Sequence, residues 1–455
     1  MSKEQRNKLW QKAYELDARI EAFTVGQDRE LDLLLATFDI AGSLAHGKML
    51  SEVGLLPPAE YEAMAQVLRQ LYQKAETGAF TIAAGVEDVH SQVEILLTEA
   101  LGDIGKKIHS GRSRNDQVLV DLRLYFRHEL ASIVRQIEAL ISLLLERSAS
   151  HKDDLLPGYT HLQVAMVSSF GLWFGAYAES LIDDLELWQA THRIINQNPL
   201  GSAAGYGSSF PLNRQRTTDL LGFRQLAYNV VHAQMGRGKS ELHFGFALAG
   251  TAQTLGKLAM DVCLYNSQNF GFLKLPDDLT TGSSIMPHKK NPDVFELLRG
   301  RCNQLLSLPA QLSQLNANLP SGYHRDFQLL KEVLFPAIQQ MKDVLAITTY
   351  AIAHLQVQPN LLNEEKYRLL FSVEEVNAAV LGGLPFRDAY RQIGESIEAG
   401  TFDPDTSPPK HTHEGSLGNL CLPEIQQKLR TVMDGFDFAK WETAMEQLVH
   451  SVQKD

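Results

Sequence analysis

The sequence is poor in cysteine. Only Cys263, Cys302 and Cys421 occur among 455 residues, and they lie far apart. No Cys-x-x-Cys pair or Cys/His cluster indicates a metal site. An odd number of scattered cysteines also argues against a disulfide framework and favours a reducing compartment.

Excess basic charge and long hydrophobic runs are lacking as well. The 42 Lys and Arg against 54 Asp and Glu give a net charge of −12, which argues against a nucleic-acid-binding surface. The most apolar stretches, such as "IEALISLLL", are too short to span a membrane, and the opening "MSKEQRNKLWQK" is too polar for a signal peptide. We therefore expect a cytoplasmic protein that binds neither nucleic acid nor membrane.

Strand signals are scarce, and "AFTIAAG" at 79–85 is the best of them. The helical period dominates instead. From Asp121 onward, apolar residues recur at alternating steps of three and four, typical of a helix in a bundle; they are Leu122, Phe126, Leu130, Ile133, Ile137, Leu140 and Leu144. Similar patterns run over 164–196, 240–270, 292–318 and 327–355, and Pro309 is expected to kink the third of these.

These patterns predict an all-α protein, and 455 residues are too many for one ordinary core. Shorter helices broken by Gly and Pro occupy residues 1–111, a small N-terminal helical domain. Residues 112–357 are predicted to form a long central helical bundle, and 358–455 a small C-terminal helical domain.

Four polar islands interrupt the helical pattern where functional loops are usually carried. "EDVHSQVE" at 87–94 holds His90 and also reads as an ordinary helix start with acidic residues at the positive end of the dipole. "GKKIHSGRSRNDQV" at 105–118 alternates Lys and Arg with small residues. Binding of an anion by this island and a solvated basic turn are about equally compatible with it.

The third island, "LPGYTHLQ" at 156–163, is expected to turn at Pro157-Gly158 and to place Thr160 and His161 directly before a long helix. A lone histidine there is more often structural than catalytic. The fourth, "TTGSSIMPHKKNPD" at 280–293, gathers serines, a histidine, lysines and an asparagine in one connection. An ordinary exposed loop explains this concentration of reactive groups poorly.

The fourth island resembles the signature of the fumarase/aspartase superfamily, Ser-Ser-x-Met-Pro-x-Lys-x-Asn. Together with "HSGRSRNDQV" and "PGYTHLQ" it makes the chain similar to the argininosuccinate lyase/δ-crystallin family. The resemblance continues through "EDVHSQVE", "NPLGSAAGYGSSFPLNR", "SGYHRDFQLLKE" and "LPFRDAYRQIG", and so covers nearly the whole chain in order.

The resemblance implies cleavage of a C–N bond β to a carboxylate, releasing fumarate. It makes Ser283 the base, whose oxyanion Lys289 and loop N–H groups would stabilise. It makes His161 either the acid for the leaving nitrogen or a support for the site, with Glu296 holding the imidazole and favouring its charged form. Donors and cations must surround the substrate's carboxylate as negative charge develops; the family's positions for substrate binding correspond here to His90, Ser113, Arg114, Asn115, Thr160 and Asn291. Tyr323, Gln328 and Lys331 match positions that hold the amino-acid end.

The resemblance also implies a homotetramer whose central bundles associate and whose sites each draw on three chains, with no metal or cofactor. The loop at 280–293 would act as a mobile lid that carries the base.

Three departures from the family's pattern stand out. Gly-Gly-Arg-Phe near the start is replaced within 7–23, and Asp28 stands near the place of a substrate-contacting serine. "MGRGKSE" replaces a segment in which acids flank the arginine; here that arginine is Arg237, and Lys239 is gained. This change leaves an N-acylated (for example N-succinyl) argininosuccinate as an alternative substrate, although Asp28 favours a free ammonium. Activity like that of adenylosuccinate lyase and a silent crystallin-like structural role are further alternatives.

Overall fold

The head of the molecule is built from short helices. In the computed structural model, which describes residues 17–450, they are α1 (Ala18–Val25), α2 (Asp28–Asp32), α3 (Ala36–Glu52), α4 (Pro58–Glu76), α5 (Val89–Leu101) and α6 (Asp103–Lys106). The segment at 79–85, the best of the few strand signals, does not form a strand. The N–H of Ala83 donates to the side chain of Gln92, 2.8 Å away, and the segment pairs with no strand of residues 17–450. Short apolar runs do not distinguish a strand from a packed coil.

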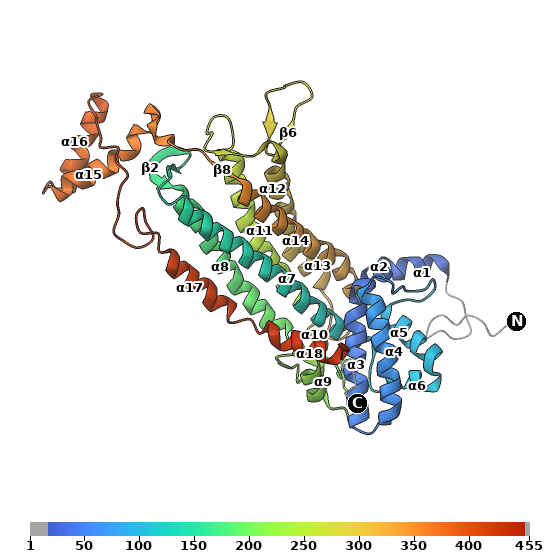
Figure 1. Cartoon of the computed structure of the whole chain (residues 1–455). Coiled ribbons are helices and arrows are strands. Elements are labelled where there is room, and N and C mark those ends of the chain that lie inside the picture. Colours follow the sequence, from blue (N-terminus) through green and yellow to red (C-terminus); the bar gives the residue numbers. More distant parts are fainter. Residues whose placement is uncertain (1–16, 451–455) are drawn as a thin grey trace.

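Four long helices run side by side along the body, as Figure 1 shows: α7 (Arg114–Ser150), α8 (Phe170–Ile195), α11 (Lys239–Tyr265) and α14 (Leu329–His354). All seven apolar residues of the predicted seam on α7 are buried, with exposed fractions of 2% or less. The prediction of an all-α fold with a long bundle is therefore confirmed.

Proline acts differently from the prediction. The pattern at 292–318 divides into α12 (Asp293–Leu305) and α13 (Leu308–Asn316), and Pro309 lies in the first turn of the second helix. Because the first turn needs no N–H from its residues, proline begins a helix there instead of bending one. Pro336 is accommodated inside α14.

The connections carry short strands. β1 (Leu155–Thr160) and β2 (Gln163–Ser169) form a hairpin, so the helix expected directly after His161 begins at Phe170 instead. Elsewhere β3 (Gln197–Asn198) pairs with β4 (Gln225–Leu226), β5 (Leu273–Lys274) with β8 (Gln356–Val357), and β6 (Thr281–Gly282) with β7 (Lys290–Asn291). Two short helices, α9 (Arg214–Leu220) and α10 (Val230–Met235), precede α11.

The last part of the chain runs along the length of the body. α15 (Ser372–Leu381) and α16 (Phe386–Glu398) lie at the end far from the head, whereas α17 (Leu422–Met433) packs on α8 and α18 (Phe438–His450) on α3 and α4 (Figure 1). The division at 111 and 357 stays a prediction. Within 17–450, none of the helices is long and apolar enough to cross a bilayer.

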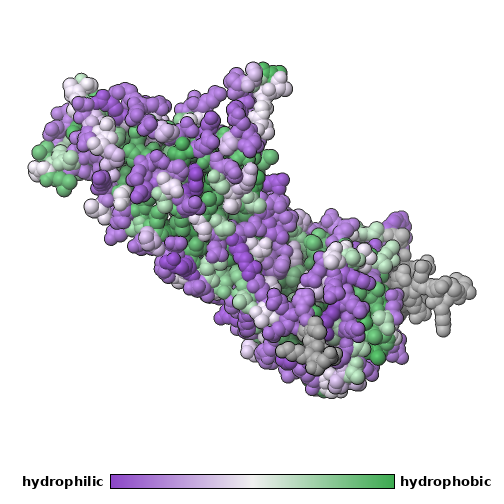
Figure 2. Space-filling model, viewed as in Figure 1, coloured by the Kyte–Doolittle hydropathy of each residue, from purple (hydrophilic) through white to green (hydrophobic). Residues whose placement is uncertain are grey.

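Apolar side chains also reach the surface of the bundle, where Figure 2 shows them along the body. Exposed members on α8, α11, α12 and α14 are Leu187, Phe246, Met260, Leu297 and Ile347, with exposed fractions of 38% to 65%. Extended exposed apolar surface on a helical bundle is typical of a face that another chain covers.

Candidate active site

Six of the thirteen predicted site residues line one pocket where the head meets the bundle. They are His90, Arg114, Asn115, Tyr323, Gln328 and Lys331, and the chain's own Asp28, Asp32, Asp88 and Arg237 complete most of the wall. The side chains leave only about 20 Å³ of open space between them. A ligand must therefore exchange ion pairs with these groups instead of filling a void.

The beginning of α7 supplies three of the predicted residues. Ser113 is the N-cap: its Oγ accepts the N–H of Asn115 at 3.3 Å, and its own N–H donates to Asp116 at 2.8 Å. This capping box fixes the first turn, so Arg114 and Asn115 face the pocket beside the positive end of the helix dipole. Ser113 does not line this pocket; it lines a neighbouring cavity that also contains His90 and Arg114, and its capping bonds give it a structural role of its own.

Two carboxylates hold Arg114. Its Nε lies 2.6 Å from Asp88 Oδ2 and its Nη1 3.0 Å from Glu87 Oε1. Burial opposes the charge, but Asp88 and Glu87 outweigh it and raise the pKa of Arg114 above its ordinary value. The guanidinium predicted to bind substrate is thus charged and already oriented.

Lys331 on α14 is held in the same way. Its Nζ lies 2.7 Å from Asp28 Oδ1 and also pairs with Asp32, and all three side chains are buried. Burial lowers the pKa of Lys331, but Asp32 and Asp28 more than compensate and raise it. Asp28, noted in the sequence as a departure, therefore lies in the pocket wall.

Gln328 connects the pocket to the end of α1. Its Nε2 donates to the carbonyl oxygens of Thr24 at 3.1 Å and Val25 at 2.8 Å. Tyr323 keeps an exposed fraction of 40% and lies at the mouth. The departure within 7–23 can be followed only from residue 17, since residues 7–16 lie outside the described part of the chain.

His90, in the first turn of α5, is buried between acids. Its Nδ1 is 2.6 Å from Asp39 Oδ1 on α3 and 3.4 Å from Asp121 Oδ2 on α7. Burial works against the charged ring, but Asp39, Asp121 and Asp88 raise the pKa of His90 to about 9. Asp32, Asp39 and Asp121 were not predicted from the sequence; the spacing of Asp28 and Asp32, one helical turn apart, was the available signal.

The Arg237 segment does not make the pocket more positive. Arg237 Nε lies 2.9 Å from Glu241 Oε1, and Nη2 donates to the carbonyl of Phe327 at 2.9 Å. Lys239 is exposed and does not line the pocket. The acids that flank this arginine in the family's pattern are absent here, and Glu241, one helical turn after Arg237, pairs with it instead.

His161 lies at the opposite end of the body, at the tip of the β1–β2 hairpin. His161 and Leu162 have φ angles of 53° and 58°, and both are exposed. A two-residue hairpin turn with positive φ at both positions normally contains Asn and Gly. A bulky pair in this conformation is strained, and such strain is concentrated at functional sites.

Ser283 and Lys289 lie in the loop between β6 and β7, which projects from the same end (Figure 1). Ser283 Oγ accepts the N–H groups of Ile285 at 3.3 Å and Met286 at 3.1 Å. The neighbouring Lys290 pairs with Asp277, whereas Lys289 forms no ion pair with a carboxylate of residues 17–450.

One chain does not bring the two ends together. Arg114 and Ser150 are separated by the whole of α7, whose 37 residues span about 55 Å at the helical rise. Thr160, His161, Ser283, Lys289, Asn291 and Glu296 all lie near the end remote from the pocket. Within the described residues of a single chain, His161 and Glu296 form no ion pair either.

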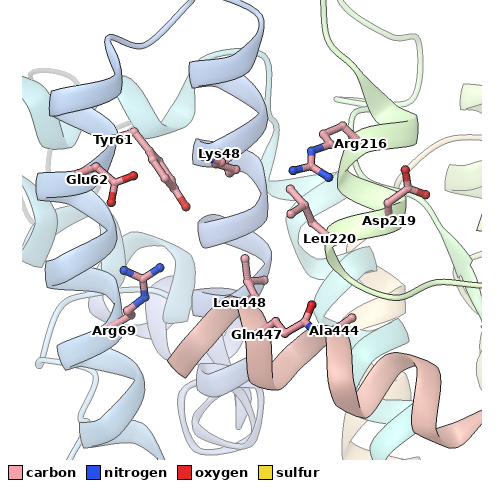
Figure 3. A pocket seen from close by; sticks show the side chains of 10 residues that line it. All are labelled: Lys48, Tyr61, Glu62, Arg69, Arg216, Asp219, Leu220, Ala444, Gln447 and Leu448. Carbon is pink, nitrogen blue, oxygen red and sulfur yellow. The ribbon is translucent and has the colours of Figure 1, made fainter. Parts of the chain in front are cut away.

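A larger cavity of about 410 Å³ lies elsewhere in the head, between α3, α4, α9 and α18 (Figure 3). Lys48, Tyr61 and Arg216 face it, but Arg216 is bound by both oxygens of Glu52, at 2.8 and 3.0 Å. It contains none of the predicted site residues, so volume does not identify the functional pocket here.

Comparison with known proteins shows the family. A family model described as "Lyase" matches residues 11–306. The argininosuccinate lyase of Parabacteroides distasonis is 59% identical over 97% of this chain and 99% of that protein. The argininosuccinate lyase of Stenotrophomonas maltophilia is 39% identical over 93% of this chain and 96% of its own length.

Solved structures share the fold at low identity. EDDS lyase in complex with formate has a TM-score of 0.74 at 22% identity, covering 96% of this chain and 95% of that one. A class II fumarase from Schistosoma mansoni has a TM-score of 0.69 at 16% identity and covers 94% of each chain. With 59% identity to an argininosuccinate lyase along nearly its entire length, the chain belongs to the argininosuccinate lyase family of carbon–nitrogen lyases.

Proposed function

We propose that this protein cleaves argininosuccinate to arginine and fumarate, as a cytoplasmic enzyme of arginine biosynthesis that uses no metal or cofactor. The observation that carries the proposal is identity of 55–59% to five argininosuccinate lyases over 97% of the chain. The three cysteines are free, which suits a reducing compartment.

The head pocket suits the arginine end of this substrate. Three carboxylates, Asp28, Asp32 and Asp88, line it, and each lies next to a cation that it already binds. An α-ammonium and a guanidinium can exchange with those cations, while the substrate's carboxylate exchanges with the acids. Paired, desolvated charges give such a site high selectivity, since an unmatched ligand leaves a buried charge without a partner.

The loop at 280–293 suits the elimination step. The N–H groups of Ile285 and Met286 already point at Ser283 Oγ and would stabilise the oxyanion that removes the proton α to the carboxylate. Lys289 would neutralise the charge that develops on this carboxylate, and the side-chain N–H groups of Asn291 would donate hydrogen bonds to it. His161, strained and exposed at its hairpin tip, would meet the leaving nitrogen as an acid or support the site, with Glu296 holding its ring.

We propose that these parts meet in a homotetramer. The pocket and the two loops lie at opposite ends of one chain, so a complete site requires the head of one chain beside the loops of others. The exposed apolar side chains of α8, α11, α12 and α14 supply a face for that association. The same arrangement would let the loop at 280–293 close over bound substrate.

No specific observation favours an acylated substrate. Of the two positive charges on which that alternative depended, Arg237 pairs with Glu241 and Lys239 lies outside the pocket, while Asp28 adds a carboxylate at the place where an ammonium would bind. Nothing in the site favours adenylosuccinate or a silent structural role.

The test is to offer the purified protein argininosuccinate, its N-succinyl derivative and adenylosuccinate, and to follow the ultraviolet absorbance of fumarate. We expect a clear preference in kcat/KM for argininosuccinate. Release of fumarate from none of the three, by correctly assembled protein, would refute the proposed function; a preference for the succinyl derivative would replace its substrate.

A further inference from the structure

Two helices of the head and the long helix α7 meet at a buried cluster behind the pocket. Asp39 of α3, His90 of α5 and Asp121 of α7 have exposed fractions of 2%, 7% and 0%. One nitrogen of the ring and one oxygen from each acid all lie within 4.8 Å of one another. The family resemblance assigns a function only to His90, and the two acids have none.

The cluster is more than a simple ion pair. Asp39 Oδ2 and both oxygens of Asp121 are buried without a hydrogen-bond partner among the described residues. Burial, and next the charge of Asp39, raise the pKa of Asp121 well above its ordinary value. Two acids around one ring nitrogen therefore favour a single arrangement, a charged imidazole with Nδ1–H directed at Asp39.

The neighbouring charges come from every element packed against the ring. Asp88, the N-cap of α5, adds negative charge, while Arg112 lies before α7 and donates through Nη1 to Ser43 of α3 at 2.9 Å. Arg114 faces Asp88. Arg112 already contributes a positive charge beside both acids, which argues against a second, divalent cation among them.

The cations of the pocket are each held through one or two nitrogens by groups of this chain. The one nitrogen of Lys331 is engaged by two acids, and Arg237 pairs with Glu241 and a carbonyl. Arg114 uses two nitrogens on Glu87 and Asp88. With Nδ1 held by Asp39, the remaining nitrogen of His90 has no carboxylate from residues 17–450, and the ring lines the pocket.

We propose that Asp39 and Asp121 are positioning residues that hold His90 as an imidazolium, so that its Nε2–H binds the carboxylate at the arginine end of the substrate. This rests on the proposed function. His90 is then a fixed cationic donor and transfers no proton during the reaction. Its two acids act through the ring and do not touch substrate.

The variants Asp39→Asn and Asp121→Asn test this, with His90→Gln for comparison. In Asp39→Asn we expect KM for argininosuccinate to rise about tenfold while kcat changes less than about twofold, since the lost interaction is made equally in ground and transition states. The pH profile of kcat/KM should gain a limb near the ordinary histidine pKa of about 6.5. His90→Gln should show the raised KM without that limb, and Asp39→Glu should restore much of the binding.

Glu129→Gln is the matched control, because Glu129 is a buried acid of α7, the helix that carries Asp121, and pairs with Lys342 at 2.7 Å, away from this pocket. It should lower thermal stability and leave KM and the pH profile unchanged. Should Asp39→Asn fail to fold, Asp121→Asn and Asp39→Glu carry the same comparison with His90→Gln.

Three results would overturn the proposal. One is a pH profile in Asp39→Asn parallel to that of the unaltered enzyme, with only thermal stability changed. Another is an equal fall in kcat and kcat/KM, which would assign the cluster to chemistry. The third is a stoichiometric divalent metal in the purified, unaltered enzyme that His90→Gln removes. An unaltered enzyme that releases no fumarate would instead refute the proposed function.

Discussion

Mixing two inactive variants should restore activity if each site is assembled from different chains. We choose Arg114→Ala, at the first residue of α7, and Ser283→Ala, in the loop after β6. The two positions lie at opposite ends of a body whose longest helix alone spans about 55 Å. A single chain therefore offers no route by which both side chains reach one substrate.

The size of the recovery follows from this geometry. In randomly assembled tetramers from an equimolar mixture, the chain that supplies Arg114 is unaltered there with a probability of about one half, and so is the chain that supplies Ser283. Because the two chains are different, the probabilities multiply, and about one quarter of the sites contain both residues. A site built within one chain would always contain one alteration and would recover nothing.

The assay is fumarate release after co-refolding, with chain mixing measured by native mass spectrometry of subunits that carry tags of different mass. A matched control mixes Ser283→Ala with Lys289→Ala, two alterations in the same loop, for which no site receives an unaltered loop. Absence of recovery in the first mixture despite demonstrated mixing, or equal recovery in the control, would refute the shared-site reasoning.

Four further outcomes are expected. Ser283→Ala should lower kcat by about 10²–10⁴-fold with little change in thermal stability, because the side chain lies on a projecting loop with no core to lose; near-normal turnover would exclude it as the base. His161→Asn should be similarly impaired and should lose one limb of the pH–rate profile, whereas an unchanged profile would leave only a structural role. Phe126→Ala should cost about 3–5 kcal/mol of unfolding free energy, since the ring is 1% exposed and lies 5.3 Å from that of Phe244; calorimetry of the variant checks this. Because the pKa of His90 is raised to about 9, the folded protein holds a proton on this ring that the unfolded chain loses near pH 6.5. The protonated ring therefore contributes fully to the free energy of unfolding below pH 6.5. This contribution, up to about 3 kcal/mol, is lost as the pH rises through 9. Denaturant unfolding across that range should show this slope in the unaltered protein and not in His90→Gln.

Much of the architecture could be predicted because helical period is a local property. The seam on α7 is read from residues three and four apart, and the same residues are buried in the structure. The hairpin at His161 could not be predicted in this way. Its positive φ angles are stabilised by pairing of the flanking strands, whereas Pro157-Gly158, the apparent turn, lies within a strand beside a bulge.

The pocket shows the same limit. Arg114, Lys331 and His90 were found as candidates, but the acids that hold them are contributed by α2, α3, α7 and the segment before α5, across separations of up to about 300 residues. An aspartate on a helix face has no local sign of what it will contact.

The sequence by itself determined the helices, the basic islands and the signature loop, because each of these features depends on residues that are close together along the chain. Only the tertiary structure decided which charges share a pocket and which groups stay apart. Helix packing places Asp28 on Lys331 and Asp39 on His90, while the length of α7 keeps the serine loop remote from both. Side chains far apart along the chain acquire partners only when the core fixes the helices, and a rigid helix separates its ends as firmly as it aligns its faces.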